Sequence, residues 1–307
     1  MIGQAIIDSE DEIHRAVDVI CSAKNGGAQF AETISSVLNQ TFRDFRFVIV
    51  DDGSDDGETA RIADDAAARD GRVSVHHNAI SLGLTANLVK YVDKSKAEFI
   101  GRIDAGDMWL PDKLEKQVAT MSQEKNIVIL GTQCDYVTPD GRIIGRSRFG
   151  EDDHVIRKAF KSGQGIFTHS SILFRRRINY RLEFRYSQDL DLYLRASELG
   201  RLYCMREPLT LCLISPDGLT LKRKYLQRKY QALAYRSHFS RTNGGKEVDL
   251  RVTDGWLERF CWNNAMPFYH RYINARTNKQ SVLVWGAYLA VALILFPPLL
   301  GDYLRRL

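Results

Sequence analysis

The first 130 residues alternate short apolar runs with stretches in which apolar residues recur every three or four positions. The apolar runs are rich in β-branched and aromatic residues, as is typical of buried strands. They cover residues 16–23, 45–50, 73–76, 98–103 and 127–130. The stretches with helical periodicity lie between them, at residues 28–39, 58–69, 84–91 and 111–124. This alternation predicts an α/β fold whose parallel strands are joined by right-handed helical crossovers.

Beyond residue 130 the alternation is less regular. We expect a hairpin with a Pro-Asp-Gly turn, then a helix, a strand, a second helix and a long basic helix. These elements cover residues 136–144, 153–161, 170–174, 189–199 and 222–238. A polar connector begins at Arg241, and it predicts two parts: an α/β domain at residues 15–240 and a C-terminal helical extension at residues 241–307.

The extension contains one apolar segment, residues 281–300, without a charged residue. About 20 apolar residues in a helix cross the hydrocarbon layer of a membrane. Basic residues flank the segment on both sides, which suits a membrane interface, but Pro297 and Pro298 would break a helix near its end. We therefore expect membrane association, as a short span or a helix lying in the interface; a buried helix of a soluble core is the alternative.

Composition narrows the class of protein further. The chain has 307 residues, a net charge of +5 and 44% hydrophobic residues, which excludes disordered and fibrous proteins. Its five cysteines form no CxxC pair, which favours reduced thiols over a disulfide framework or a zinc site. The first 20 residues carry early acidic residues and no long apolar core, so we expect no signal peptide.

Basic residues are concentrated in the second half of the chain. They form either an ordinary solvated face or a surface for phosphates or an anionic membrane, and the sequence does not separate the two. We expect no nucleic-acid partner.

Acidic residues follow two of the predicted strands. Asp51 and Asp52 come directly after residues 45–50, and Asp104 and Asp107 follow residues 98–103. In open α/β sheets, ligands bind at the carboxyl ends of the strands. Clustered carboxylates repel one another unless a cation lies between them, and Mg²⁺ and Mn²⁺ prefer such oxygen ligands. The structural alternatives are an ordinary turn after the first strand and a capping turn after the second.

Two further residues are candidates for chemistry. Asp189 begins a predicted helix, where the N–H groups and the helix dipole favour a carboxylate, although N-capping alone explains it more simply. His169 precedes the strand at residues 170–174, and it is either a site residue or a buried histidine whose hydrogen bonds are satisfied.

Taken together, these segments resemble the family 2 glycosyltransferases of GT-A fold over residues 15–225. Six segments match in the family's order: residues 17–20 with Lys24 and Asn25, VIVDDGS at 48–54, SLGLT at 81–85, FIGRIDAGD at 99–107, HSSILFRR at 169–176 and QDLDLYLR at 188–195. The resemblance implies a Rossmann-like GT-A nucleotide-sugar-binding domain with a mixed, mostly parallel sheet.

The resemblance also implies a reaction and roles. The family moves a sugar from a nucleotide-diphosphate sugar to an acceptor hydroxyl, usually with inversion at the anomeric carbon. By the same resemblance, Asp189 is the general base, and Asp104 and Asp107 bind ribose and a divalent cation, Mn²⁺ or Mg²⁺. The other donor-binding positions are Asp51 or Asp52 for the nucleoside, together with Lys24, Gly83 and His169.

Two departures from the family pattern qualify these roles. Gly106 replaces a carboxylate of the usual metal loop, and Gln188 replaces the usual glutamate before the base. The Gln-x-x-Arg-Trp motif of the processive synthases is missing from the sequence, which favours addition of a single sugar.

The sequence thus predicts an inverting, metal-dependent hexosyltransferase at the cytoplasmic face of the cell membrane. Its acceptor would be a saccharide or a lipid-linked sugar, in cell-surface polysaccharide or glycolipid synthesis. One alternative is a sugar-phosphate nucleotidyltransferase, for which residues 24–27 are a thin candidate loop. The other is a non-catalytic nucleotide-sugar-binding or membrane scaffold protein, which Gly106 and Gln188 keep open.

Overall fold

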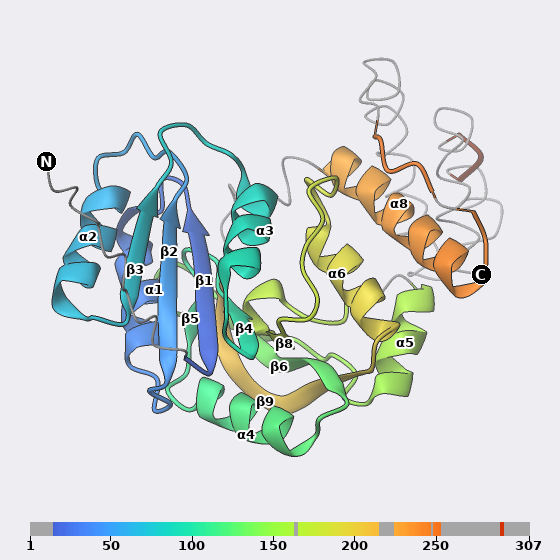
Figure 1. The fold of residues 1–307 in the computed structure, drawn as a ribbon, viewed down its shortest axis with the longest axis horizontal. Coiled ribbons are helices and arrows are strands. Elements are labelled where there is room, and N and C mark those ends of the chain that lie inside the picture. The colour runs from blue at the N-terminus through green and yellow to red at the C-terminus, as the bar shows by residue number, and fades with distance from the viewer. Residues whose placement is uncertain (1–14, 163–164, 215–223, 247, 253–288, 292–307) are drawn as a thin grey trace, which may run out of the picture.

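One mixed sheet forms the centre of the molecule in the computed structural model (Figure 1), which describes residues 15–162, 165–214, 224–246, 248–252 and 289–291. Within these residues the sheet has nine strands. Eight follow the order β3-β2-β1-β4-β8-β6-β9-β5, and β7 pairs with β6 at the side.

The strands of the first half are parallel, as the sequence predicted. They are β1 (Val17–Ala23), β2 (Phe45–Asp51), β3 (Val73–His77) and β4 (Phe99–Arg102). The helices between them are α1 (Gly27–Leu38), α2 (Thr59–Arg69) and α3 (Leu84–Lys94). Because β2 and β4 pair with opposite sides of β1, the order of the strands reverses there, which is where α/β sheets bind ligands.

Helices cover both faces of this half-sheet (Figure 1). On one face α1 buries Phe30 against Val19 of β1, and on the other α3 buries Leu88 against Ile20 of the same strand. Adjacent residues of a strand point to opposite faces, so Val19 and Ile20 serve two separate cores. Burial on both faces explains why the strands are continuous apolar runs.

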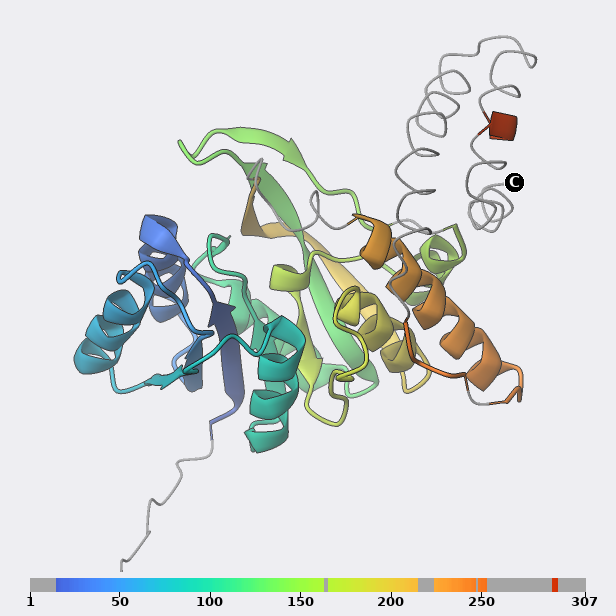
Figure 2. The same cartoon turned by 90° about the horizontal axis from the view of Figure 1, so that it is seen from above.

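The second half of the chain adds strands of both directions. They are β5 (Met108–Trp109), β6 (Ile127–Val137), β7 (Ile143–Arg146), β8 (Leu173–Arg175) and β9 (Arg201–Leu213). The strand β8 lies antiparallel between β4 and β6, which makes the sheet mixed. The expectation that the sheet is mostly parallel is wrong for the described residues, because four strand pairings are parallel and four are antiparallel. The predicted hairpin is β6 and β7, and it projects from the body of the domain (Figure 2).

Two strand predictions were incomplete or wrong. The longest strand, β9, was not predicted, because Arg206, Glu207 and Pro208 interrupt its apolar pattern. The strand expected at residues 170–174 begins later, since His169–Ser171 form a 3₁₀ turn, η1, followed by β8. The hydroxyl of Ser171 donates to the Thr168 carbonyl at 2.7 Å, a local bond that competes with strand pairing.

The remaining helices are α4 (Lys113–Gln123), α5 (Asp153–Ser162), α6 (Gln188–Ser197) and α8 (Lys224–Thr242). The helices α6 and α8 pack side by side (Figure 1). The expected boundary between residues 240 and 241 falls within the last turn of α8, and the division into two parts stays a prediction. None of the described helices is long and apolar enough to span a membrane. Apart from residues 289–291, the apolar segment 281–300 lies outside the described residues.

A glycine sets the turn after β2. Gly53 has φ +67°, and a Cβ atom there would lie 2.9 Å from the backbone nitrogen of Ser81. Glycine is therefore needed both for the left-handed backbone and for the close approach of the loop at residues 78–83.

We expect Gly53→Ala to destabilise the protein more than Gly57→Ala does. Gly57 also has a left-handed backbone, φ +65°, but no atom lies within 4 Å of its added Cβ. The control should lose about 1 kcal/mol, the cost of a left-handed L-residue, and Gly53→Ala about 1–3 kcal/mol more because of the backbone clash. Urea unfolding measures both values, and equal losses would contradict the steric argument.

Candidate functional site

A cavity of about 970 Å³ opens at the carboxyl end of β4. Four of the predicted site residues line it: Gly83 before α3, Asp104 after β4, His169 of η1 and Asp189 of α6. These residues are up to about a hundred positions apart in the chain. The fold therefore brings half of the predicted site together, and the other predicted residues do not line this cavity.

The most buried charge of the cavity belongs to Arg102, the last residue of β4. Its side chain is 2% exposed, and it forms an ion pair with both carboxylate oxygens of Asp104, whose side chain is 49% exposed. Burial acts to lower the pKa of Arg102, but the charge of Asp104 outweighs it and the pKa lies above its usual value. Removing Asp104 would leave a buried charge without compensation, which typically costs several kcal/mol.

Sequence reasoning did not single out Arg102. The signal was present, because Arg102 is a charged residue within an otherwise apolar strand. Lys and Arg are almost never fully buried unless they are paired, so such a position points to a partner nearby.

Asp107 does not line the cavity, and it connects neighbouring elements. It is 8% exposed; one oxygen accepts a hydrogen bond from the Ser170 hydroxyl, and the other accepts one from the Leu213 N–H at 2.9 Å. Burial, and next the charge of Asp104, raise its pKa to about 7. Asp107 thus ties η1 and β9 to the loop that carries Asp104.

The backbone explains the glycine in this loop. Gly106 has φ +104°, and a Cβ atom there would lie 3.1 Å from the Leu213 side chain. A carboxylate-bearing residue at this position would be strained, so the departure from the family pattern is part of the local fold.

The two carboxylates of the acidic loop have different surroundings, because Asp104 lines the cavity and Asp107 does not. The described residues contain no cluster of three or more His, Cys, Asp or Glu side chains that could hold a metal ion. Asp104 reaches the cavity but is shared with Arg102, and both oxygens of Asp107 are engaged elsewhere. The residues present fit a cation held by one carboxylate, with its other ligands from water or a bound phosphate. The predicted role of Asp107 as a metal ligand stays a prediction.

Asp189 lies in the first turn of α6 and is partly buried. The residue before the helix, Ser187, has a left-handed backbone with φ +52° and makes no side-chain cap. Burial raises the pKa of Asp189, against the opposing effects of the Leu190 N–H and the charge of Arg102. A carboxylate that binds protons more tightly than usual and borders a cavity suits a general base.

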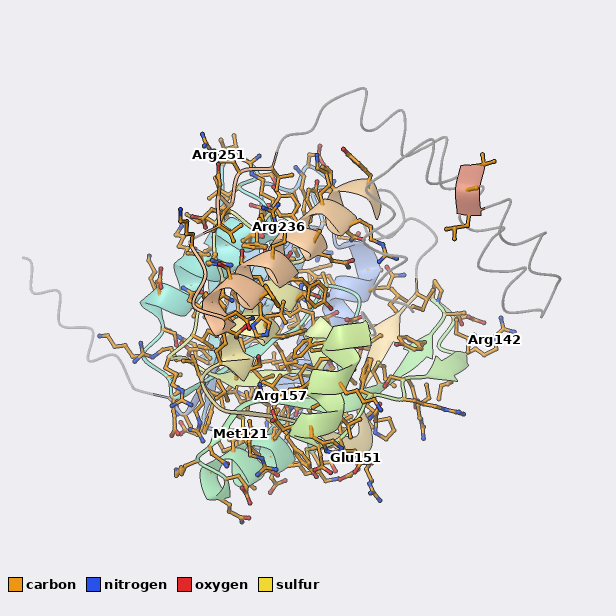
Figure 3. The ribbon with its side chains drawn as sticks, turned by 90° about the vertical axis from the view of Figure 1, so that its right-hand side faces the viewer. Met121, Arg142, Glu151, Arg157, Arg236 and Arg251 are labelled. Atoms are coloured by element: carbon orange, nitrogen blue, oxygen red, sulfur yellow. The ribbon has the colours of Figure 1, made fainter. Side chains whose placement is uncertain are left out.

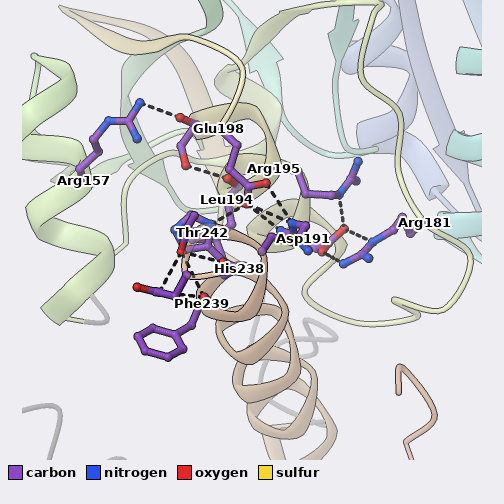
Figure 4. A network of polar contacts seen from close by, with 12 residues as sticks. Arg157, Arg181, Asp191, Leu194, Arg195, Glu198, His238, Phe239 and Thr242 are labelled. Carbon is purple, nitrogen blue, oxygen red and sulfur yellow. Dashed lines mark hydrogen bonds and ion pairs between the residues drawn. The ribbon is translucent and has the colours of Figure 1, made fainter. Parts of the chain in front are cut away.

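Ion pairs fix the helix that carries Asp189 (Figure 4). Asp191, fully buried, pairs with Arg181 and Arg195, and the Nε atoms of these arginines lie 3.0 and 2.9 Å from it. At the other end of α6, Glu198 pairs with Arg241 of α8 at 2.8 Å. These contacts hold the helix in place, and they occupy Arg181, Arg195 and Arg241.

His169 is both a satisfied buried histidine and a residue of the cavity. Its Nε2 lies 2.7 Å from the Tyr180 hydroxyl, and burial followed by the charge of Arg102 lowers its pKa well below the usual value. The imidazole is therefore neutral. A hydrogen bond from the Trp109 indole N–H to the Ser170 carbonyl, at 2.7 Å, holds η1, the turn that carries His169.

Asp52 is fully engaged by the protein itself. Its carboxylate accepts four hydrogen bonds, from Asn78 at 2.9 Å, the Ser81 hydroxyl at 2.7 Å and the N–H groups of Leu82 and Gly83 at 2.8 and 2.9 Å. Burial acts to raise its pKa, but these donors outweigh it and the pKa is lowered. Asp52 thus anchors the loop that brings Gly83 to the cavity.

Asp51 and Lys24 lie outside the lining of the cavity. Asp51 accepts a hydrogen bond from the Ser54 N–H at 3.0 Å and contacts His77 at 3.1 Å. Lys24 is exposed after β1. The nucleotide-binding roles of Asp51, Asp52 and Lys24 stay predictions.

The cavity lies near the switch in strand order, which is where open α/β sheets bind ligands. A family model described as "Glycosyl transferase family 2" matches residues 18–182. The chain therefore belongs to glycosyl transferase family 2, and the family predicted from the sequence is confirmed.

Curated relatives agree with this assignment. The putative glycosyltransferase EpsE of Bacillus subtilis is 29% identical, covering 68% of this chain and 76% of that protein. An uncharacterized glycosyltransferase of Methanocaldococcus jannaschii is 27% identical and covers 58% of this chain. The O-antigen biosynthesis glycosyltransferase WbnJ of Escherichia coli is 29% identical and covers 53%. The matches span 63% and 64% of the length of the last two relatives.

Solved structures share the fold. Residues 1–349 of Staphylococcus aureus TarS in complex with UDP-GlcNAc align with a TM-score of 0.57 at 16% identity, covering 90% of each chain. The mannosyltransferase PcManGT of Pyrobaculum calidifontis, in complex with GDP-Man and Mn²⁺, aligns with a TM-score of 0.51 at 14% identity, covering 94% of this chain and 76% of that one. The predicted α/β fold with a mixed sheet of GT-A type is confirmed.

Proposed function

We propose that this protein transfers one sugar from a nucleotide-diphosphate sugar to an acceptor hydroxyl with inversion, in polysaccharide or glycolipid synthesis. The observation that carries this proposal is the position of Asp104 and Asp189 in one cavity of a family 2 chain. Two relatives carry names from polysaccharide synthesis, the O-antigen enzyme and a putative teichuronic acid enzyme of Bacillus subtilis. The two solved structures hold UDP-GlcNAc and GDP-Man, which supports a nucleotide-sugar donor.

Asp189 acts as the general base in this proposal. It takes the proton of the acceptor hydroxyl while that oxygen attacks the anomeric carbon from the side opposite the leaving nucleotide diphosphate. Attack from that side inverts the anomeric centre. Ion pairs hold α6 in place, so the carboxylate needs little rearrangement when the acceptor binds. His169 is neutral and adds no charge to the site.

The donor would occupy the side of the cavity formed by Asp104 and the loop that Asp52 anchors. The exposed edge of the Asp104 carboxylate can accept hydrogen bonds from ribose hydroxyls. The first residues of α3, Leu84 to Ala86, also line this side, and the N-terminus of a helix favours an anion such as a diphosphate.

A divalent cation, Mn²⁺ or Mg²⁺, would be held by Asp104 in this proposal. Such a cation stabilises the negative charge that develops on the leaving diphosphate. The Mn²⁺ in the complex of the mannosyltransferase supports a cation in a protein of this fold.

The family assignment favours glycosyl transfer over nucleotidyl transfer, and residues 24–27, the thin candidate loop, do not line the cavity. The non-catalytic alternative rests on Gly106 and Gln188. Turnover of a donor distinguishes the two, because a scaffold protein would bind the nucleotide-sugar without releasing its nucleotide.

We also propose that the protein acts at the cytoplasmic face of the cell membrane, on a saccharide or lipid-linked acceptor. The support is the uncharged apolar stretch at residues 281–300 with Arg276 and Lys279 before it and Arg305 and Arg306 after it.

We expect Asp189→Asn to lower the rate of sugar transfer by about 10²–10⁴, because the amide cannot accept the proton. The control is Glu32→Gln, which removes an exposed carboxylate from α1, outside both hollows, and should keep activity. Nucleotide release from a panel of UDP- and GDP-sugars, with a panel of saccharide acceptors, measures the rate, and NMR of the product measures inversion. Full activity of Asp189→Asn would exclude it as the base.

The same base predicts how activity depends on pH. Only the deprotonated carboxylate of Asp189 accepts a proton, and burial raises its pKa above that of an ordinary aspartate, about 3.9. As the pH falls, the rate of sugar transfer should therefore decrease at a higher pH than it would with an aspartate of ordinary pKa. An acid limb at or below the ordinary value would contradict the buried environment of Asp189.

We expect Mn²⁺ to bind weakly without nucleotide and at least about tenfold more tightly with UDP or GDP, a difference of about 1.4 kcal/mol. The reason is that one shared carboxylate gives too few ligands, and the diphosphate supplies others. Calorimetry with Mn²⁺ measures both states, and Asp107→Asn should bind like the wild type. Tight binding without nucleotide that Asp107→Asn abolishes would instead show a two-carboxylate site.

We expect the full chain to sediment with vesicles of phosphatidylcholine and phosphatidylserine. The double variant Leu293→Asp/Leu295→Asp should lose this binding, since a charge in the hydrocarbon layer costs about 2.5–3.5 kcal/mol. Leu199→Asp, at an exposed leucine after α6, is the control and should bind as the wild type does. If the double variant binds the vesicles as the wild type does, residues 281–300 do not form the membrane contact.

A further inference from the structure

A second hollow, of about 1020 Å³, adjoins the cavity that holds Asp104 and Asp189. The two share Leu182 and Arg185, which lie on the loop leading to α6. Glu183, Tyr230 of α8 and residues 248–252 form the rest of the second hollow. Arg185 therefore stands at the junction, four residues before the proposed base.

Arg185 differs from the other cations that line the two spaces. Arg102 is paired with Asp104, and Arg251 is paired with Asp249 at 2.7 Å. His169 is neutral. Arg185 is exposed, and it forms no hydrogen bond or ion pair among the residues that the structure describes. Its positive charge is thus left for a ligand.

The backbone around Arg185 is held in place. Phe184 is fully buried; its ring lies 4.6 Å from the Arg181 guanidinium, and its carbonyl accepts a hydrogen bond from the Thr85 hydroxyl at 2.8 Å. On the other side, the Ser187 hydroxyl donates to the Gln227 carbonyl at 3.1 Å. Only the side chain of Arg185 must become ordered on binding, which limits the entropy lost.

We propose that Arg185 binds a phosphate group of a substrate at the junction of the two spaces, an inference that rests on the proposed glycosyl transfer. A guanidinium presents a planar fork of N–H donors that matches phosphate oxygens in a bidentate geometry. A leaving diphosphate gathers negative charge, and Arg102 is already neutralised by Asp104. The phosphate belongs either to the donor diphosphate or to an acceptor that carries a phosphate next to its sugar.

The test compares Arg185→Ala and Arg185→Lys with the control Arg142→Ala. Arg142 is also exposed, and its side chain has no partner among the described residues, but it lies on the β6–β7 hairpin, away from Arg251 and α8 (Figure 3). Both alanine variants change the net charge equally, so a difference between them reports position. Circular dichroism checks that each variant is folded.

Binding is measured by calorimetry in two arms. The donor arm uses UDP, GDP, inorganic pyrophosphate and, without phosphate, uridine. The acceptor arm uses glucose 1-phosphate and glucose, each with saturating UDP. We expect Arg185→Ala to weaken the binding of the phosphate-bearing probes of one arm about 10- to 100-fold. The affinity for uridine and glucose should not change. Arg185→Lys should retain part of the binding, because it keeps the charge and loses the fork.

Each outcome has a defined meaning. A loss in the donor arm assigns Arg185 to the leaving diphosphate, and a loss in the acceptor arm alone assigns it to an acceptor phosphate. If Arg185→Ala binds every probe as Arg142→Ala does, the inference is wrong while the proposed function stands. If the wild type binds no phosphate-bearing probe, both the inference and the proposed function fail.

Discussion

The ion pair between Arg102 and Asp104 is the constraint on which the candidate site depends. A guanidinium that is 2% exposed requires a counter-charge, and Asp104 supplies it two residues after Arg102, at the edge of the cavity. The pair sets the position of Asp104 without any ligand. Burial lowers the pKa of His169, and the charge of Arg102 lowers it further; the same charge opposes the rise that burial causes in the pKa of Asp189. One buried charge thus influences the protonation of both His169 and Asp189.

The acidic residues of the family motifs divide into two kinds of role. Asp52 and Asp107 satisfy backbone and hydroxyl donors and connect segments distant in sequence: Asp52 holds the loop before α3, and Asp107 holds η1 and β9. Asp104 and Asp189 instead present carboxylates to the cavity. Acidic residues that follow a strand can therefore stabilise the fold as well as take part in chemistry, because a carboxylate can accept several hydrogen bonds at once.

The second half of the chain completes the site by packing. The helix α6 carries Asp189, and its own position depends on Asp191 with two arginines and on Glu198 with α8. These pairs use the basic residues of this region for structure. Internal ion pairs thus account for part of the excess of basic residues in the second half of the sequence. Arg185 lines the cavity and takes part in none of these pairs among the described residues.

The sequence by itself determined the β-α-β half of the fold, the family and the acidic ends of β2 and β4. These features depend on periodicity and on neighbouring residues, which are local properties of a chain. Tertiary structure alone decided which of the acids face the cavity. Asp107 finds its partners 63 and 106 positions away, and β9 forms despite Arg206, Glu207 and Pro208 because β6 pairs with it. Hydrogen-bond partners and burial of this kind arise from packing between distant segments, which no local pattern records.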